Sequence, residues 1–180
     1  TVSVQTSNGP GSGIAPVGVS ASRATDIPAF YAEWFAGRLA AGHLSWTNPF
    51  NSRQKQLVSF AKARVVVFWS KNPAPIERYL HQLDERGINY YFTFTVNDYE
   101  HEGLEKSVPP LAARLETFRR LSERLGGERV VWRFDPIIVG GPLTAERILE
   151  KIGHIGDQLH RHARTLVISF VDIARYRTVR

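Results

Sequence analysis

The 180 residues contain no cysteine, and this absence excludes several kinds of chemistry from them. Without thiols they form no disulfide, hold no zinc through thiolates, ligate no iron–sulfur cluster and supply no cysteine nucleophile. Methionine is absent as well. Because natural chains start with methionine, we expect these residues to be a stretch of a longer protein.

Long apolar runs and dense charge clusters are missing too. No apolar run approaches the roughly 18 residues that a membrane helix needs, and no N-terminal signal pattern is present, so we expect a cytoplasmic protein with no membrane partner. The formal net charge is +6, but no five basic residues stand together. A moderately basic chain favours anionic partners, and nucleic acid stays open as one of them.

Residues 1–16 differ from the rest of the chain. Val2 and Val4 alternate with polar residues, and the Asn-Gly-Pro-Gly-Ser-Gly run at 8–13 interrupts regular structure. No Gly-Lys-Ser/Thr follows these glycines, which disfavours a phosphate-binding loop. We predict a flexible glycine-rich arm or a short hairpin, followed by a single domain over residues 17–180.

From residue 17 onward, strand and helix patterns alternate. The predicted strands are Val17–Ser20, Leu44–Thr47, Val65–Trp69, Tyr90–Thr95, Val130–Phe134 and Leu166–Val171, with Gln56–Phe60 as a candidate for a short extra strand. The predicted helices are Pro28–Ala41, Ile76–Arg86, Leu111–Leu125 and a last one that Thr144 caps and that reaches about His160. The four tryptophans are assigned to the core.

This alternation defines the fold class as α/β. Repeated βα units imply a mainly parallel sheet with right-handed crossovers. About six units are present, fewer than the eight of a full barrel, and no Gly-x-Gly-x-x-Gly turn follows the first strand, which disfavours a dinucleotide-binding sheet. We therefore predict a TIM-like partial (β/α)6 barrel in preference to an open doubly wound sheet.

Polar residues stand at the C-terminal end of nearly every predicted strand. In strand order they are Ser22, Arg23 and Asp26; Asn48; Lys71 and Asn72; Thr93; Arg133 and Asp135; and Ser169 and Asp172. The carboxyl ends of parallel strands meet at one edge, where ligands of α/β proteins bind. We predict that these residues bind a small anionic or zwitterionic ligand, and that Arg133, Asp135, Lys71 and Asp26 are the catalytic ones.

Arg133 and Asp135 are the favoured pair. Arg133 lies in an apolar strand, where a charge must be paired or must reach a ligand, and residues two apart on a strand share a face. Structural alternatives remain: a structural ion pair for Arg133 and Asp135, a helix N-cap for Asp26, and turn residues before proline for Asn48 and Asn72. The six histidines form no His-Glu-x-x-His pattern, so no metal site is predicted.

Six segments in this order resemble a bacterial family, domain of unknown function eighteen forty-eight: residues 20–31, 48–51, 67–73, 91–95, 131–137 and 167–172. The resemblance runs from about Val17 to Asp172. It implies a longer parent that continues into a cysteine cluster similar to that of radical S-adenosylmethionine enzymes, which are built on (β/α)6 partial barrels. It thereby implies S-adenosylmethionine and a [4Fe-4S] cluster as cofactors of that parent, whereas these residues supply no cluster ligand.

Three hypotheses about function follow, in order of preference. The first is a radical S-adenosylmethionine-like enzyme domain. The second is a metal- or phosphate-dependent barrel enzyme acting on a nucleotide or sugar phosphate, with carboxylates as acid, base or Mg²⁺ ligands. The third is a non-catalytic nucleic-acid-binding module, which rests on the net charge and on the arginines between residues 161 and 180.

Overall fold

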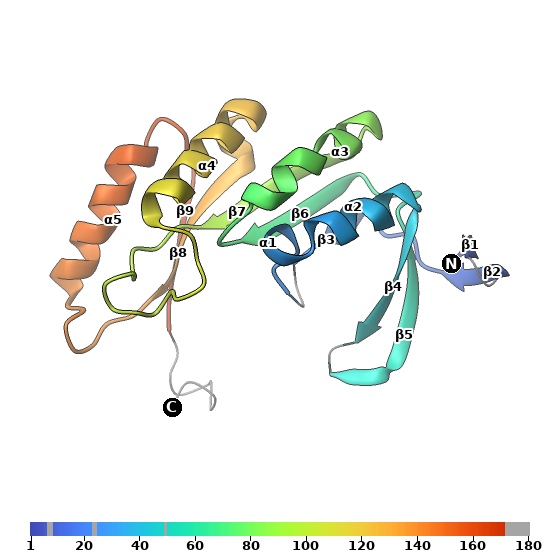
Figure 1. The fold of residues 1–180 in the computed structure, drawn as a ribbon, viewed down its shortest axis with the longest axis horizontal. Helices are drawn as coiled ribbons and strands as arrows, with labels where there is room; N and C mark the ends of the chain where they lie inside the picture. Colours follow the sequence, from blue (N-terminus) through green and yellow to red (C-terminus); the bar gives the residue numbers. More distant parts are fainter. Residues whose placement is uncertain (7–8, 23–24, 49, 172–180) are drawn as a thin grey trace. The chain divides into compact units, whose positions relative to one another are not determined.

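The computed structural model describes residues 1–6, 9–22, 25–48 and 50–171, and its elements are labelled in Figure 1. The strands are β1 Val2–Thr6, β2 Gly9–Gly13, β3 Gly18–Ser20, β4 His43–Asn48, β5 Asn51–Ser59, β6 Val65–Ser70, β7 Asn89–Thr95, β8 Val130–Ile137 and β9 Leu166–Phe170. The α-helices are α1 Ile27–Phe30, α2 Ala32–Ala40, α3 His81–Glu85, α4 Leu111–Leu125 and α5 Ala145–Leu159. Two 3₁₀ helices, η1 Ala74–Tyr79 and η2 Gly127–Arg129, complete the set for the described ranges.

The architecture is mixed α/β with a five-stranded sheet in the order β3-β6-β7-β8-β9. Strands β3 and β6 pair in parallel, as do β8 and β9. The chain divides into two compact units, Thr1–Phe92 and Thr93–Arg180. Within the described ranges, no helix has both the length and the apolarity needed to cross a membrane.

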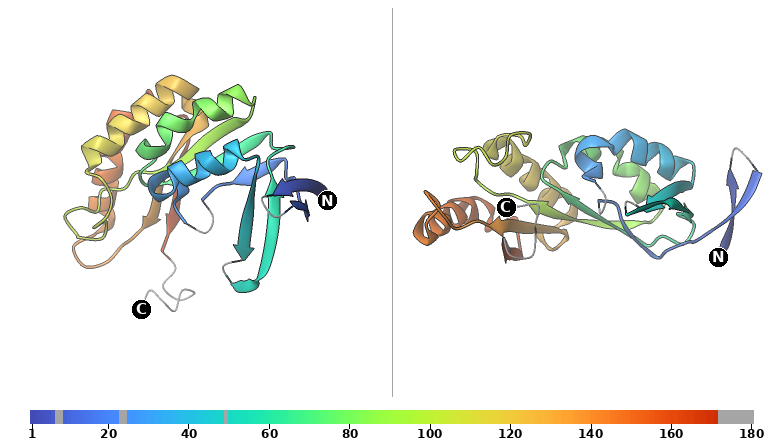
Figure 2. Two further views of the ribbon diagram at one scale, coloured as in Figure 1. Left: turned by 45° about the vertical axis from the view of Figure 1, so that its right-hand side comes forward. Right: turned by 90° about the horizontal axis from the view of Figure 1, so that it is seen from below.

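The core of the first unit is built on one face of β6. Phe68 from β6 stacks on Phe92 with ring centroids 5.0 Å apart, and Phe35 from α2 meets Phe68 edge-on at 5.5 Å. Figure 2 shows α1, α2 and α3 on the same side of these strands. The neighbouring residue Trp69 points to the opposite face and is 49% exposed. Assigning every tryptophan to the core is therefore wrong for Trp69, and Trp34 and Trp46 are partly exposed as well.

The predicted strand Leu44–Thr47 exists as β4, but it does not belong to the parallel sheet. It pairs antiparallel with β5 in a separate two-stranded sheet, with Leu44 opposite Val58. The reason is the short link between the two strands, because a parallel crossover needs a dozen or more residues. The sixth parallel unit is thus absent from the described sheet. The candidate strand Gln56–Phe60 coincides, up to Ser59, with the C-terminal part of a longer β5.

The predicted helix Pro28–Ala41 is two helices, α1 and α2, which meet at Tyr31. Tyr31 has φ −132°, outside the helical region, and it ends α1 and precedes α2. The predicted helix Ile76–Arg86 likewise divides into η1 and α3, with a proline in the first turn of η1. The N-terminal residues form the β1–β2 hairpin, whose exit is fixed by the hydrogen bond from Ile14 N to Leu57 O at 2.9 Å.

Both helices that the sequence predicts in the second unit are present, as α4 and α5. Helix α4 covers Leu111–Leu125 and ends at Gly126, whose φ of 90° suits glycine. Helix α5 begins after Thr144, whose hydroxyl accepts the Arg147 N–H at 3.2 Å. Phe118 of α4 stacks on Phe94 of β7 with centroids 5.6 Å apart, so α4 covers this part of the sheet.

Candidate functional site

Asp26 ties the loop after β3 to the end of β6 in the first unit. One carboxylate oxygen, Oδ1, accepts the Ala29 N–H at 3.0 Å and so caps α1. The other, Oδ2, accepts the Ser70 hydroxyl at 2.9 Å and the Lys71 N–H at 3.1 Å. We call Ser22, Asp26, Ser70 and Lys71 the Asp26 cluster.

The other members of this cluster complete the anchor. Ser22 Oγ accepts the Trp69 N–H at 3.1 Å, and Ser70 Oγ accepts the Asn72 N–H at 2.9 Å. The predicted binding residues Ser22 and Asn72 and the predicted catalytic residue Lys71 are therefore fixed through their backbone or hydroxyl groups, and all three are half-buried. A carboxylate that accepts three donors acts as an electrostatic anchor for the loop. The N-cap alternative for Asp26 is observed, together with this further contact to β6.

The second unit brings together Arg133, Asp135, Ser169 and Asn97, which we call the Asp135 cluster. Arg133 Nε donates to Asp135 Oδ2 at 3.1 Å, and Nη2 donates to the same oxygen. The Ser169 hydroxyl of β9 donates to Oδ1. The fully buried Asn97 amide donates to Asp135 O and accepts the Asp135 N–H, both at 3.0 Å. Side chain and backbone of Asp135 are therefore both held.

The Asp135 cluster lies on the less covered face of β8. Trp132 and Phe134 are buried on the other face. Helix α5 packs closely on Trp132 there, because a Cβ added at Gly156 would lie 3.7 Å from the Trp132 ring. Strand alternation places Arg133 and Asp135 on the opposite face. Their side chains are 19% and 23% exposed, so both reach solvent. A guanidinium and a carboxylate side by side match the two charges of a zwitterion.

The remaining predicted residues are placed elsewhere. Asn48 lies in the β4–β5 hairpin, where Oδ1 accepts the Phe50 N–H at 2.9 Å and Nδ2 donates to Gln54 at 2.6 Å. It therefore shapes the hairpin turn. The prediction that Asn48 stands at the end of a parallel strand is wrong. Thr93 is buried within β7. Arg23 and Asp172 lie outside the described residues.

Sequence reasoning missed a group of buried polar residues beside the Asp135 cluster. The Tyr99 hydroxyl donates to Pro136 O at 2.9 Å and accepts the Ile138 N–H at 3.3 Å, which holds the end of β8. Burial raises the pKa of Tyr99, the Ile138 N–H opposes this rise, and the Glu105 and Glu102 carboxylates add to it.

Two buried cations hold the loop that carries Tyr99. Arg114 pairs with Glu105 at 3.3 Å and with Glu100 at 3.2 Å. Lys151 pairs with Glu102 at 3.2 Å and donates to Asp98 O at 2.6 Å. A signal for both was in the sequence, because Arg114 and Lys151 each occupy a position on the apolar stripe of their helix, where a charge requires a partner.

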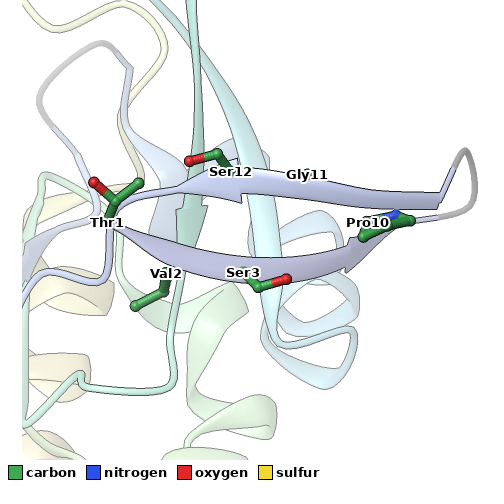
Figure 3. Close-up of a pocket in the computed structure, with 6 residues that line it drawn as sticks. All are labelled: Thr1, Val2, Ser3, Pro10, Gly11 and Ser12. Carbon is green, nitrogen blue, oxygen red and sulfur yellow. The ribbon is translucent and has the colours of Figure 1, made fainter.

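The described residues were also compared with the requirements of a metal site and of a ligand cavity. In the described ranges, no group of three or more His, Asp or Glu side chains is arranged to hold a metal ion. A hollow of about 390 Å³ lies on the β1–β2 hairpin, and Figure 3 shows its lining residues Thr1, Val2, Ser3, Pro10, Gly11 and Ser12. This lining carries no charged side chain, and it belongs to the hairpin alone.

Comparison with known proteins gives the family. No curated protein and no solved structure matches the chain. A family model described as "Domain of unknown function (DUF1848)" matches residues 19–180. That match includes both clusters and all five strands of the parallel sheet except the first residue of β3. The chain therefore belongs to the domain of unknown function family DUF1848.

Proposed function

We propose that the chain is an enzyme domain that binds a small zwitterionic or anionic molecule at the Asp135 cluster. The observation that carries this proposal is the Arg133–Asp135 ion pair, in which both charged groups reach solvent. The Asn97 amide fixes the backbone of Asp135, and the Ser169 hydroxyl of β9 fixes its carboxylate. Such an arrangement offers donors for a carboxylate or phosphate and an acceptor for an ammonium group. It is also preorganised, which reduces the entropy lost on binding.

The enzyme class that we propose is radical S-adenosylmethionine-like, with the parallel strands as part of a partial barrel in a cytoplasmic protein. The residues fit one part of what this class requires, because S-adenosylmethionine ends in an amino-acid zwitterion that Arg133 and Asp135 match in charge. They do not fit the cluster, which needs thiolates that these 180 residues lack. We therefore derive no catalytic step through it.

The Asp26 cluster lies within the first unit and carries a separate assignment. The Asp26 carboxylate accepts the Ser70 hydroxyl and the Lys71 N–H, and Ser70 Oγ in turn accepts the Asn72 N–H, so the backbone of Lys71 and Asn72 is fixed at the end of β6. We assign the Lys71 ammonium to an anionic group of a ligand, since a fixed backbone limits the space that its side chain can sample. Asp26 is then a positioning residue.

Calorimetric titration of the purified chain with methionine, S-adenosylmethionine and ribose 5-phosphate tests the proposal. We expect the first two to bind and Arg133→Ala to weaken them at least tenfold, because a hydrogen bond to a charged group contributes roughly 1.5–3 kcal/mol. Arg147→Ala is the matched control, since Arg147 is an exposed arginine of α5 that pairs with Glu150. Binding of ribose 5-phosphate alone would instead favour the phosphate-dependent enzyme. Equal losses in both variants would refute the site.

A further inference from the structure

A second recess lies within the first unit, and the residues of the Asp26 cluster are not among those that line it. It has a volume of about 220 Å³, is open to solvent on one side, and is lined by residues of β3, α1, α2 and the β4–β5 hairpin. Its lining residues are Val19, Ser20, Ala21, Ile27, Trp34, Phe35, Leu44, Ser45, Trp46, Thr47 and Val58. We call it the tryptophan pocket.

Two features distinguish this pocket from ordinary surface. First, Trp34 is 44% exposed and Trp46 is 38% exposed, although both are large apolar side chains that burial would stabilise. Second, none of the described residues that line the pocket carries a charge, and their polar side chains are the hydroxyls of Ser20, Ser45 and Thr47. An apolar recess with a few hydroxyls is the usual composition of a small-molecule site.

The walls of the pocket are held in place by contacts outside it. The base of the β4–β5 hairpin is joined to its surroundings by the hydrogen bonds from Ser59 N to Ile14 O at 2.8 Å and from Phe60 N to Gly42 O at 2.9 Å. Phe35 is fixed by its edge-on contacts with Phe60 and Phe68. The pocket is therefore formed before any ligand arrives.

We propose that the tryptophan pocket binds an uncharged planar aromatic or heteroaromatic ring of one or two fused rings. The volume sets the size, because an apolar cavity of about 150 Å³ accepts benzene. The uncharged side chains of the described lining residues select a neutral group, since burying an ion without a partner is unfavourable. Indole side chains select an aromatic ring, because offset or edge-on aromatic pairs contribute beyond the area they bury. This site is independent of the ligand proposed for the Asp135 cluster.

Benzimidazole, a neutral bicyclic ring near pH 7.5, is the probe for this proposal, and tryptophan fluorescence is the readout. We expect saturable quenching with a dissociation constant that is millimolar or tighter, as ligand-efficiency limits allow for so small a molecule. Trp34→Ala and Trp46→Ala should each weaken binding about tenfold. Trp69→Ala is the matched control, because Trp69 is also partly exposed but does not line the pocket.

Two further measurements make the outcome decisive. Trp34→Phe keeps an aromatic ring, so it should retain binding even if Trp34→Ala perturbs folding, which circular dichroism reports. Cyclohexanol, an uncharged non-aromatic ring, should bind at least tenfold more weakly than benzimidazole. Failure to saturate, equal binding of cyclohexanol, or an equal effect of Trp69→Ala would each overturn the proposal.

Discussion

Tyr99 shows how single buried polar groups shape the end of β8. Its hydroxyl is both donor to Pro136 O and acceptor from the Ile138 N–H, and its side chain is almost fully buried. Burial disfavours the phenolate, and the nearby Glu105 and Glu102 carboxylates disfavour it further, so the pKa of Tyr99 rises above the ordinary value for tyrosine. The folded protein therefore holds this proton more tightly than the unfolded chain does.

This shift predicts a specific loss of stability in alkali. As pH rises above the ordinary tyrosine value, the unfolded state releases the Tyr99 proton first, so the free energy of unfolding falls until the folded-state pKa is passed. Tyr99→Phe should remove this contribution, and at neutral pH it should lower the free energy of unfolding by about 1–3 kcal/mol, because the half-buried Pro136 O and Ile138 N–H lose their partner. Urea denaturation at a series of pH values measures both effects. Tyr31→Phe, at a half-exposed position, is the control and should change stability by less than about 0.5 kcal/mol at neutral pH.

At the residue scale, the sequence predicted contacts that arise from local spacing. Arg133 and Asp135 were paired because residues two apart share a strand face, and the structure shows their ion pair. Asn97 was not singled out in the same way, because its partner is the backbone of a residue 38 positions away. Every residue type carries a backbone carbonyl, so the identity of a residue does not show that its backbone is a partner, and residue spacing alone cannot reveal the contact.

At the scale of elements, the start of α5 has a defined cap. The Thr144 hydroxyl accepts the Arg147 N–H, and the pKa of Glu146 is lowered by its own backbone N–H and by Thr144. Both groups satisfy N–H donors that the first turn of a helix leaves without intrahelical partners.

Removing this cap gives the element-scale prediction. Thr144→Ala should lower the free energy of unfolding by about 1 kcal/mol, and it should move the pKa of Glu146 back toward its ordinary value, because one cause of the lowering is gone. Thermal denaturation and NMR titration of the Glu146 carboxyl report these changes. Thr144→Ser, which keeps the hydroxyl, should retain both properties. If Thr144→Ser lost as much as Thr144→Ala, packing of the methyl group would be responsible instead of the cap.

The elements that sequence predicted well are those whose signal is local. Helix α4 has a regular apolar stripe and a glycine stop, and its predicted bounds are the observed ones. The strand β5 has no such signal, because its first six residues, from Asn51 to Gln56, are exposed and polar. Its pairing with β4 depends on the hairpin link, so a pattern search for apolar runs finds only its C-terminal part. The break at Tyr31 is equally invisible to a stripe that continues from α1 into α2.

At the scale of the whole molecule, the alternation of strands and helices identified the α/β class, whereas the sheet order did not follow from it. In the described part of the chain, five strands and not six form the parallel sheet, because one apolar segment pairs in a hairpin. Apolar periodicity records which residues are buried, but it does not record which strand is the neighbour. The closure of a sheet into a barrel is a property of the neighbours, so it could not be derived from periodicity.

The net charge of +6 raises the question of whether the chain binds nucleic acid, and the salt dependence of its affinity for DNA answers it. For a module that binds nucleic acid through 6–10 phosphate contacts, the affinity falls by a factor of about 10³–10⁵ between 50 and 200 mM salt. Because we propose a small-ligand enzyme domain, we expect only weak binding to duplex DNA and a loss below about tenfold over the same range, measured by fluorescence anisotropy. A thousandfold loss would contradict this and favour a nucleic-acid-binding module. In that case Arg53→Gln with Lys55→Gln, two exposed basic positions of β5, should flatten the salt slope if the β4–β5 hairpin is the contact surface.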